Sequence, residues 1–178
     1  LYDFELVSGE DRISSYFALR TIKAEGKDLL LNGKPYFFHG LLDQGYFSDG
    51  IYLPATPKGF ENDIITMKKL GFNMLRKHIK IEPMRWYYHC DRLGYIVWGE
   101  YGNWGLDWSD ERALEAMLCE WCECVERDFN HPSIIVWSMG NEAGHGKNFM
   151  MGYEMIKGMD QSRPVQYERA DGGPGTDI

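Results

Sequence analysis

The 178-residue sequence lacks the features that mark several functional classes. It has no apolar run of the ~18 residues that a membrane span requires. Its 19 Lys and Arg are outnumbered by 27 Asp and Glu, and the net charge of −8 argues against broad binding to nucleic acids or anionic membranes. The N-terminus, LYDFELVSGEDR, lacks the basic and apolar regions of a signal peptide. Because the sequence does not begin with Met, it leaves the cellular localisation unknown.

Signatures of metal, cofactor and triad chemistry are missing as well. GNEAGHG at 140–146 is G-x-x-x-G-x-G, not the dinucleotide-binding G-x-G-x-x-G, and neither G-x-S-x-G nor H-E-x-x-H occurs. Three of the four Cys lie in CEWCEC at 119–124, inside a helical pattern without a second ligand pair, so we expect thiols on a helix face rather than a zinc site. The sequence predicts no metal site and no cofactor, and it leaves a requirement for magnesium or sodium open.

The composition of the sequence indicates a globular chain that is rich in aromatic rings. Apolar types make up 44% of the sequence and aromatic types 15%, which suffices for one domain with a real core. Rings exposed in a cleft would suit stacking on sugars, although we assign most of them to packing.

Strands and helices alternate after a β-rich start. Residues 1–34 are predicted to form strands, with Asn32-Gly33 as a two-residue hairpin turn. Beyond them the pattern predicts strands at 35–42, 72–79, 95–100, 133–140 and 165–168. Because helical periodicity separates these strands, the order implies right-handed βαβ units and a parallel sheet.

The loops favour a (β/α)8 TIM-type barrel over an open, doubly wound sheet. Those after strand ends, at 43–56, 101–108 and 141–147, are long and carry Asp, Asn, Glu, His and Trp. Links from helix to strand are short, and barrel enzymes place their active sites on the rim where strands end. A closed barrel needs eight strands over ~250 residues. Since about five strands are found, we predict a partial α/β barrel, a fragment of a longer protein.

Two residues at the end of the fourth barrel strand are the leading candidates for chemistry. Glu142 is expected between apolar strands and aromatic loops, surroundings that favour the protonated carboxylic acid and suit a general acid. Asn141 offers an amide that can grip a substrate hydroxyl. The alternative is that Asn141-Glu142 only caps the helix that follows.

Other rim residues are candidates for substrate binding. Arg76 and His78 end the second strand, where an Arg can orient a carboxylate through two hydrogen bonds or form a surface ion pair. Glu100 ends the third strand, and Trp104 in the next loop can stack on a sugar ring or pack within that loop. The Asp and Gln at 43–44 are either polar contacts for a sugar or turn residues.

Four segments resemble the catalytic barrel of glycoside hydrolase family two, the β-galactosidases, β-glucuronidases and β-mannosidases. HPSIIVWSMGNEAGHG at 131–146 is similar to the family's acid/base signature. LLLNGKPYFFHG, DIITMKKLGFNMLRKH and YYHCDRLGYIVWGE precede it in the family's order and spacing. The resemblance covers residues 16–170, and SYFALRTI looks like the link from a preceding immunoglobulin-like domain. It implies a β-rich lead-in over 1–34 and the N-terminal part of the barrel over 35–178.

The resemblance implies an enzyme, a retaining exo-β-glycosidase of β-galactosidase-like type. Glu142 matches the acid/base, Asn141 the residue that binds the sugar's 2-hydroxyl, and Arg76 the residue that supports the nucleophile. In the family the nucleophile is a Glu at the end of the seventh strand, which has no counterpart here, so the fragment alone is expected to be inactive. Neither Glu100 nor Glu168 is assigned that role.

Departures from the best-known β-galactosidases leave the glycone and linkage open. LLDQGYF, KHIKIEP and VWGEYG replace that group's stretches after strands one, two and three, so we expect a different subgroup. The competing interpretation is a non-catalytic carbohydrate-binding or scaffold module on a barrel framework. A third is an aldolase with Lys77 or Lys80 as its Schiff base. The expected partner is a β-linked sugar, with no nucleic acid and no membrane, and the sequence leaves open whether the protein is a homo-oligomer.

Overall fold

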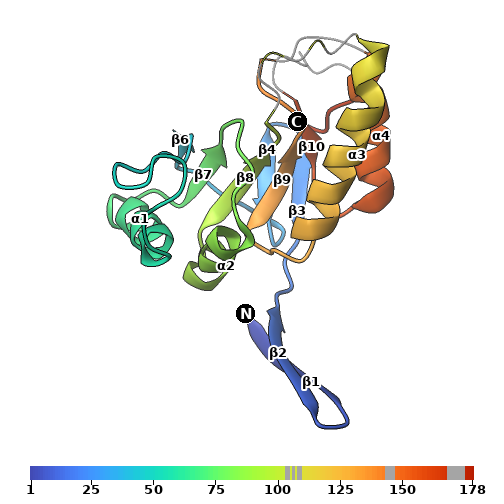
Figure 1. Ribbon diagram of the computed structural model, residues 1–178. Coiled ribbons are helices and arrows are strands. Elements are labelled where there is room, and N and C mark those ends of the chain that lie inside the picture. Colours follow the sequence, from blue (N-terminus) through green and yellow to red (C-terminus); the bar gives the residue numbers. More distant parts are fainter. Residues whose placement is uncertain (103–104, 106, 108–109, 143–146, 168–174) are drawn as a thin grey trace.

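A computed structural model describes residues 1–102, 105, 107, 110–142, 147–167 and 175–178. Its centre is a five-stranded parallel sheet in the order β10-β9-β8-β7-β6 (Figure 1). The strands are β6 (Gly40–Asp43), β7 (Met74–Lys77), β8 (Ile96–Glu100), β9 (Ile134–Ser138) and β10 (Val165–Gln166). From β7 onwards each strand pairs with the strand before it in the chain, which confirms the predicted partial barrel.

Helices cover one face of this sheet, which we call the outer face (Figure 1). In the described residues they are α1 (Lys58–Lys69), α2 (Met84–Leu93), α3 (Glu111–Asp128) and α4 (Lys147–Met159). Side chains of the four helices and the outer face share one buried cluster, which includes Ile64, Trp86, Trp121, Ile156, Leu75 and Val97. Full burial of each such side chain contributes about 1.5–3 kcal/mol. None of the described helices is long and apolar enough to cross a bilayer.

The strand β9 illustrates how an apolar run becomes a strand buried on both faces. All five of its residues are buried. Ile134 and Trp137 join the cluster under the helices, whereas Ile135 and Val136 join a second cluster on the inner face together with Ile22. Parallel strands covered on both sides need such continuous apolar sequence, so local sequence and tertiary packing agree here.

A small antiparallel sheet lies against the inner face. It consists of β3 (Ile22–Glu25), β4 (Asp28–Leu31) and β5 (Lys34–Pro35). The turn between β4 and β5 is the predicted Asn32-Gly33 hairpin, and both residues have positive φ, 53° and 74°. That conformation is the one that Asn-Gly hairpin turns adopt, which confirms the prediction.

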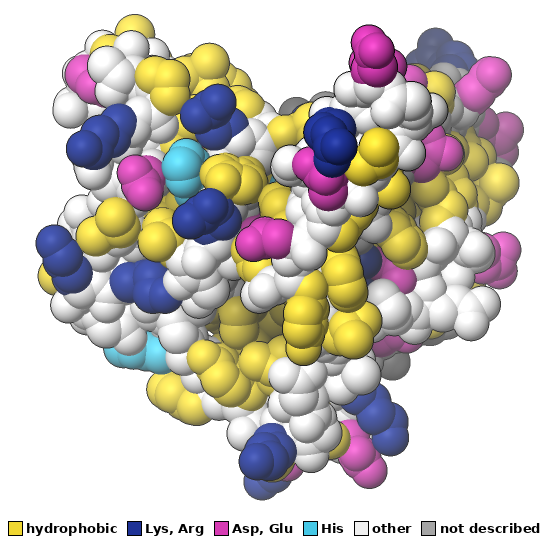
Figure 2. All heavy atoms as spheres, turned by 90° about the horizontal axis from the view of Figure 1, so that it is seen from below, with side chains coloured by type: hydrophobic (Ala, Val, Ile, Leu, Met, Phe, Trp, Pro, Cys, Tyr) yellow, Lys and Arg dark blue, Asp and Glu magenta, His cyan; other side chains and the backbone are white. Residues whose placement is uncertain are grey.

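The first residues form a hairpin that projects from the rest of the molecule (Figure 1). Its strands are β1 (Tyr2–Ser8) and β2 (Asp11–Phe17), joined in antiparallel register. Leu6 and Ile13 face each other on it and are 57% and 61% exposed. Seen from below, hydrophobic side chains lie among charged ones on this side of the molecule (Figure 2). The hydroxyl of Tyr16 donates to Asp91 Oδ2 at 2.7 Å, which ties the hairpin to α2.

The prediction of a strand over 35–42 is wrong for its first half. β6 begins only at Gly40, and Phe37 is 81% exposed. The side chain of Asn73 explains the difference, because its Oδ1 accepts from the His39 backbone N–H and its Nδ2 donates to the Phe37 carbonyl, both at 2.9 Å. A polar side chain from a distant segment therefore replaces the strand ladder that the apolar run predicted.

A buried ion pair closes the N-terminal end of β9. Arg163 Nη1 lies 2.5 Å from Asp160 Oδ2, and the two side chains are 4% and 1% exposed. The same carboxylate accepts from the indole N–H of Trp137, and the guanidinium also donates to the backbone carbonyls of Ile134 and Phe129. These bonds fix the position at which the chain enters β9.

Candidate active site

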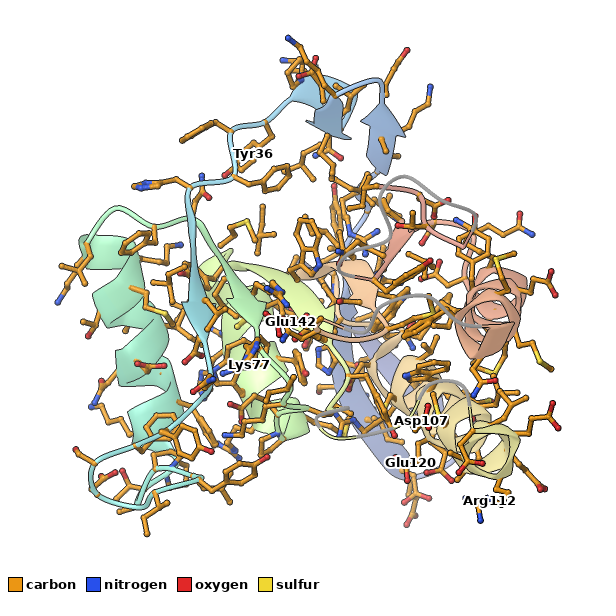
Figure 3. The ribbon with its side chains drawn as sticks, turned by 90° about the horizontal axis from the view of Figure 1, so that it is seen from above. Tyr36, Lys77, Asp107, Arg112, Glu120 and Glu142 are labelled. Atoms are coloured by element: carbon orange, nitrogen blue, oxygen red, sulfur yellow. The ribbon has the colours of Figure 1, made fainter. Side chains whose placement is uncertain are left out.

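The candidate residues lie where β6 to β9 end, at 43–45, 76–82, 98–102 and 138–142, a set that we call the rim. Side chains alternate between the two faces of a strand. Lys77 points to the outer face, because its Nζ lies 4.4 Å from the ring centroid of buried Trp86 in α2. Its neighbour Arg76 therefore points inward. Viewed from above, Glu142 and Lys77 lie near the middle of this edge (Figure 3).

Arg76 is the centre of a polar network that spans three strands. Its Nε donates to Glu100 Oε2 at 2.9 Å, and its Nη2 donates to Asn141 Oδ1 at 2.6 Å. Glu100 also accepts from Ser138 Oγ at 3.1 Å and from the Ile79 backbone N–H at 2.9 Å. The guanidinium thus fixes the orientation of the Asn141 amide, and hydrogen bonds from Arg76, Ser138 and Ile79 hold the Glu100 carboxylate.

Glu100 is a supporting group in this geometry. Its side chain is fully buried, and Arg76 lies 22% exposed above it. A buried carboxylate with a guanidinium partner and further hydrogen bonds is well satisfied. Glu100 therefore acts on the rim through Arg76, and the sequence had placed both of them among the sugar contacts.

Glu142 follows directly at the rim in an unusual backbone conformation. Its φ is 47°, in the left-handed region that non-glycine residues rarely occupy. Such conformations cost of order 1–3 kcal/mol and cluster at functional sites. The turn aims a carboxyl group from the end of β9, next to the amide that Arg76 orients. This arrangement can present one proton donor and one hydrogen-bonding amide to the same ligand.

The expectation that Glu142 is enclosed by apolar walls is not met. Its side chain is exposed in this structure. Residues 143–146, which follow it, lie outside the described residues, as does Trp104, the predicted stacking ring.

His78 lies at the rim beside Gln44, the residue that follows β6. Its Nδ1 is 3.0 Å from Gln44 Nε2, and its backbone N–H donates to the Asp43 carbonyl at 2.8 Å. The sequence proposed His78 for substrate binding, and its pairing with Gln44 was not foreseen.

A buried charge cluster within the rim was missed by sequence reasoning. Lys77, Lys80 and Glu82 are at most 3% exposed, and Glu82 Oε1 lies 2.8 Å and 3.1 Å from the two ammonium groups. Lys77 also pairs with Asp43. The spacing K-x-x-K-x-E at 77–82 was the available signal. Because both amines are buried in ion pairs, neither is presented at the rim as a Schiff base, which argues against an aldolase.

The thiols of CEWCEC lie in α3, and Cys119 is exposed while Cys122 and Cys124 are partly buried. Within the described residues no group of three or more His, Cys, Asp or Glu is arranged to hold a metal ion. The helix itself begins after Asp110, whose side chain accepts from the Arg112 backbone N–H.

Replacing Arg76 by Lys is expected to lower kcat/KM of the complete protein roughly 10²-fold, the scale of a misplaced substrate-positioning group. A single ammonium keeps the charge beside Glu100 but lacks the planar fork with which the guanidinium donates to Glu100 and Asn141 at once. Steady-state kinetics measure the loss, and thermal unfolding should move little. Arg12→Lys, in the exposed pair with Glu5, is the matched control and should leave both unchanged. Equal kinetics for R76K and R12K would contradict this role.

Comparison with known proteins identifies a family and solved structures to which the chain is similar. The family model described as "Glycosyl hydrolases family 2, TIM barrel domain" matches residues 22–177. The β-D-glucuronidase of Dictyoglomus thermophilum is 24% identical with a TM-score of 0.80, over 99% of this chain and 34% of that one. A family 2 β-galacturonidase from Eisenbergiella tayi, bound to galacturonate, is 26% identical with a TM-score of 0.76, over 88% of this chain and 30% of that one.

A third solved structure, apo β-glucuronidase 3 of Bacteroides uniformis, is 22% identical with a TM-score of 0.80, over 94% of this chain and 23% of its own. The chain therefore spans between about a quarter and a third of the length of the proteins that it matches. The family model covers nearly all of it and agrees with the resemblance in the sequence. The chain belongs to glycosyl hydrolase family 2, within its TIM barrel domain.

Proposed function

We propose that the complete protein is a retaining exo-β-glycosidase and that this chain supplies its general acid/base. The observation that carries the proposal is the position of Glu142, at the end of β9 and next to an Asn141 amide held at 2.6 Å by Arg76. Family membership supports hydrolysis of a glycosidic bond as the reaction class. Barrel enzymes place their reacting groups at the ends of strands, where both residues lie.

The geometry suits one of the two carboxylates of a two-carboxylate mechanism. Glu142, as the acid, donates its proton to the glycosidic oxygen while the bond to the anomeric carbon breaks. As the carboxylate, it then takes a proton from the water that attacks the glycosyl intermediate. A retaining enzyme needs a second carboxylate about 5–5.5 Å away as nucleophile, which we assign to a part of the protein outside these 178 residues. The Asn141 amide binds a hydroxyl of the sugar.

The glycone is the open part of this proposal. The sequence favours a β-galactosidase-like enzyme, whereas the matched structures are described as β-glucuronidases and a β-galacturonidase. Neutral sugars and uronates differ by a carboxylate, so one panel of substrates separates them.

The test is hydrolysis of nitrophenyl β-galactoside, β-glucuronide, β-galacturonide and β-mannoside by the complete protein, with the product anomer followed by NMR. We expect one glycone to be preferred and the β-anomer to form first. Initial release of the α-anomer contradicts retention, and binding of sugars without hydrolysis supports the carbohydrate-binding module instead. The isolated 178-residue chain serves as a control, and it should hydrolyse none of the four.

A further inference from the structure

Gln44 is an exposed rim residue with one defined hydrogen bond. Its Nε2 lies 3.0 Å from Nδ1 of His78, which is half-buried. Where this amide N–H donates, Nδ1 is the acceptor, and the tautomer of the imidazole that fits the contact carries its proton on Nε2. No other hydrogen bond from the described part of the chain reaches the two side chains.

Both side chains face the inner side of the rim. In the parallel register of β6 and β7, Asp43 lies opposite Lys77, and these two side chains pair with each other on the outer face. Gln44 and His78 come one residue after this pair, just past the ends of β6 and β7, and from the alternation of side chains we infer that both lie on the inner side. This is the side of the network formed by Arg76.

The backbone around Gln44 is held by buried charges. Before it, Asp43 pairs with Lys77, and the Asp43 Oδ1 also accepts from the Gly45 N–H at 2.8 Å. After it, the Gly45 carbonyl accepts from Lys80 Nζ at 2.6 Å. Glu82 bridges both lysines. These buried ion pairs and hydrogen bonds hold the backbone on both sides of Gln44.

Gly45 makes the position of this loop specific. Its φ is 66°, and a Cβ there would lie 2.3 Å from Glu82 Oε1. Only glycine allows the backbone to approach the buried carboxylate this closely. The loop thus holds the exposed amide of Gln44 in one place, as preorganised binding groups require.

We propose that Gln44 is a specificity-determining residue that binds two neighbouring hydroxyls of the glycone together with His78. The Nε2–H of His78 donates to one hydroxyl oxygen, and Gln44 Oε1 accepts from the next hydroxyl. A donor and an acceptor, side by side and without net charge, match a vicinal diol of a pyranose ring. This inference rests on the proposed glycosidase function and deepens it by assigning a hydroxyl subsite.

The first test compares Gln44→Met with wild type in the complete protein, using the preferred aryl glycoside and its 3-deoxy, 4-deoxy and 6-deoxy analogues. For wild type we expect at least one deoxy analogue to lose about tenfold or more in kcat/KM. With the parent substrate, kcat/KM of Gln44→Met should be about tenfold lower than that of wild type, mainly because KM rises. Replacing the parent substrate by that deoxy analogue should then lower kcat/KM of the variant only slightly further. Gln161→Met, at an exposed turn after α4, is the matched control. Equal discrimination in Gln44→Met and wild type overturns the proposal.

The second test does not depend on hydrolysis. Histidine labelled with ¹⁵N reports which ring nitrogen of His78 is protonated, and we expect the Nε2–H form in wild type. Gln44→Glu places an acceptor beside Nδ1, so the proton should move to Nδ1. Free sugars of the panel should shift the His78 signal in wild type and not in Gln44→Met. A signal that no sugar shifts overturns this proposal, whereas sugar binding without hydrolysis overturns only the enzymatic function.

Discussion

Replacing Glu142 by Gln is expected to lower kcat/KM of the complete protein about 10²- to 10⁴-fold for substrates with poor leaving groups. The amide keeps the shape of the side chain but can neither donate the proton to the leaving oxygen nor accept one from water. Activated dinitrophenyl glycosides need little proton donation, so their first step should lose far less. The dependence of rate on leaving-group pKa, measured by steady-state and burst kinetics, reports this directly.

Azide provides a second readout for the same variant. An anion needs no general base, so it should attack the glycosyl intermediate, accelerate turnover of Glu142→Gln and give a β-glycosyl azide. Glu115→Gln on the exposed side of α3 changes the same chemical groups away from the rim and should behave as wild type. Rates that fall equally for good and poor leaving groups would show that Glu142 is not the acid/base.

Replacing Asp160 by Asn is expected to destabilise the barrel by about 3–5 kcal/mol. The change leaves the buried guanidinium of Arg163 without its counter-charge at 2.5 Å. Urea unfolding of the complete protein, followed by tryptophan fluorescence, should show the barrel transition at lower urea. Glu5→Gln breaks the exposed pair with Arg12 and should cost no more than about 1 kcal/mol. Matching midpoints for D160N and E5Q would contradict the assignment.

The effect of Asp160→Asn should depend on pH in one direction. Burial acts to raise the pKa of Asp160, but hydrogen bonds from Ser162, Trp137 and Arg163 outweigh it and lower the pKa to about 2. The unfolded carboxyl titrates near ~3.9. The ionised group therefore stabilises the fold fully above about pH 4, and its contribution falls as the pH drops towards 2. The difference in stability between wild type and variant should shrink over that range.

Strand-by-strand patterns predicted most of the fold, because β9 and its neighbours are continuous apolar runs between turn signals. The place of Glu142 followed from the same logic, since a parallel barrel gathers its chemistry where strands end. Such local patterns do not predict contacts between segments that are distant in the sequence. Asn73 displaced the expected strand at 36–39, and Gln44 met His78 across 34 positions in the chain. Such pairings depend on the register between neighbouring strands, and this register cannot be read from the residue pattern of a single sequence.

The strand order of the parallel sheet has a consequence for biosynthesis. Because β6 to β10 lie side by side in the order in which they are translated, each strand can add to its predecessor as the chain leaves the ribosome. Pairing between successive units keeps the loops to be closed short, which favours rapid folding. The bonds that join Arg76, Glu100 and Asn141 can therefore form once residue 141 has emerged, so the acid/base side of the rim takes shape before translation of later segments.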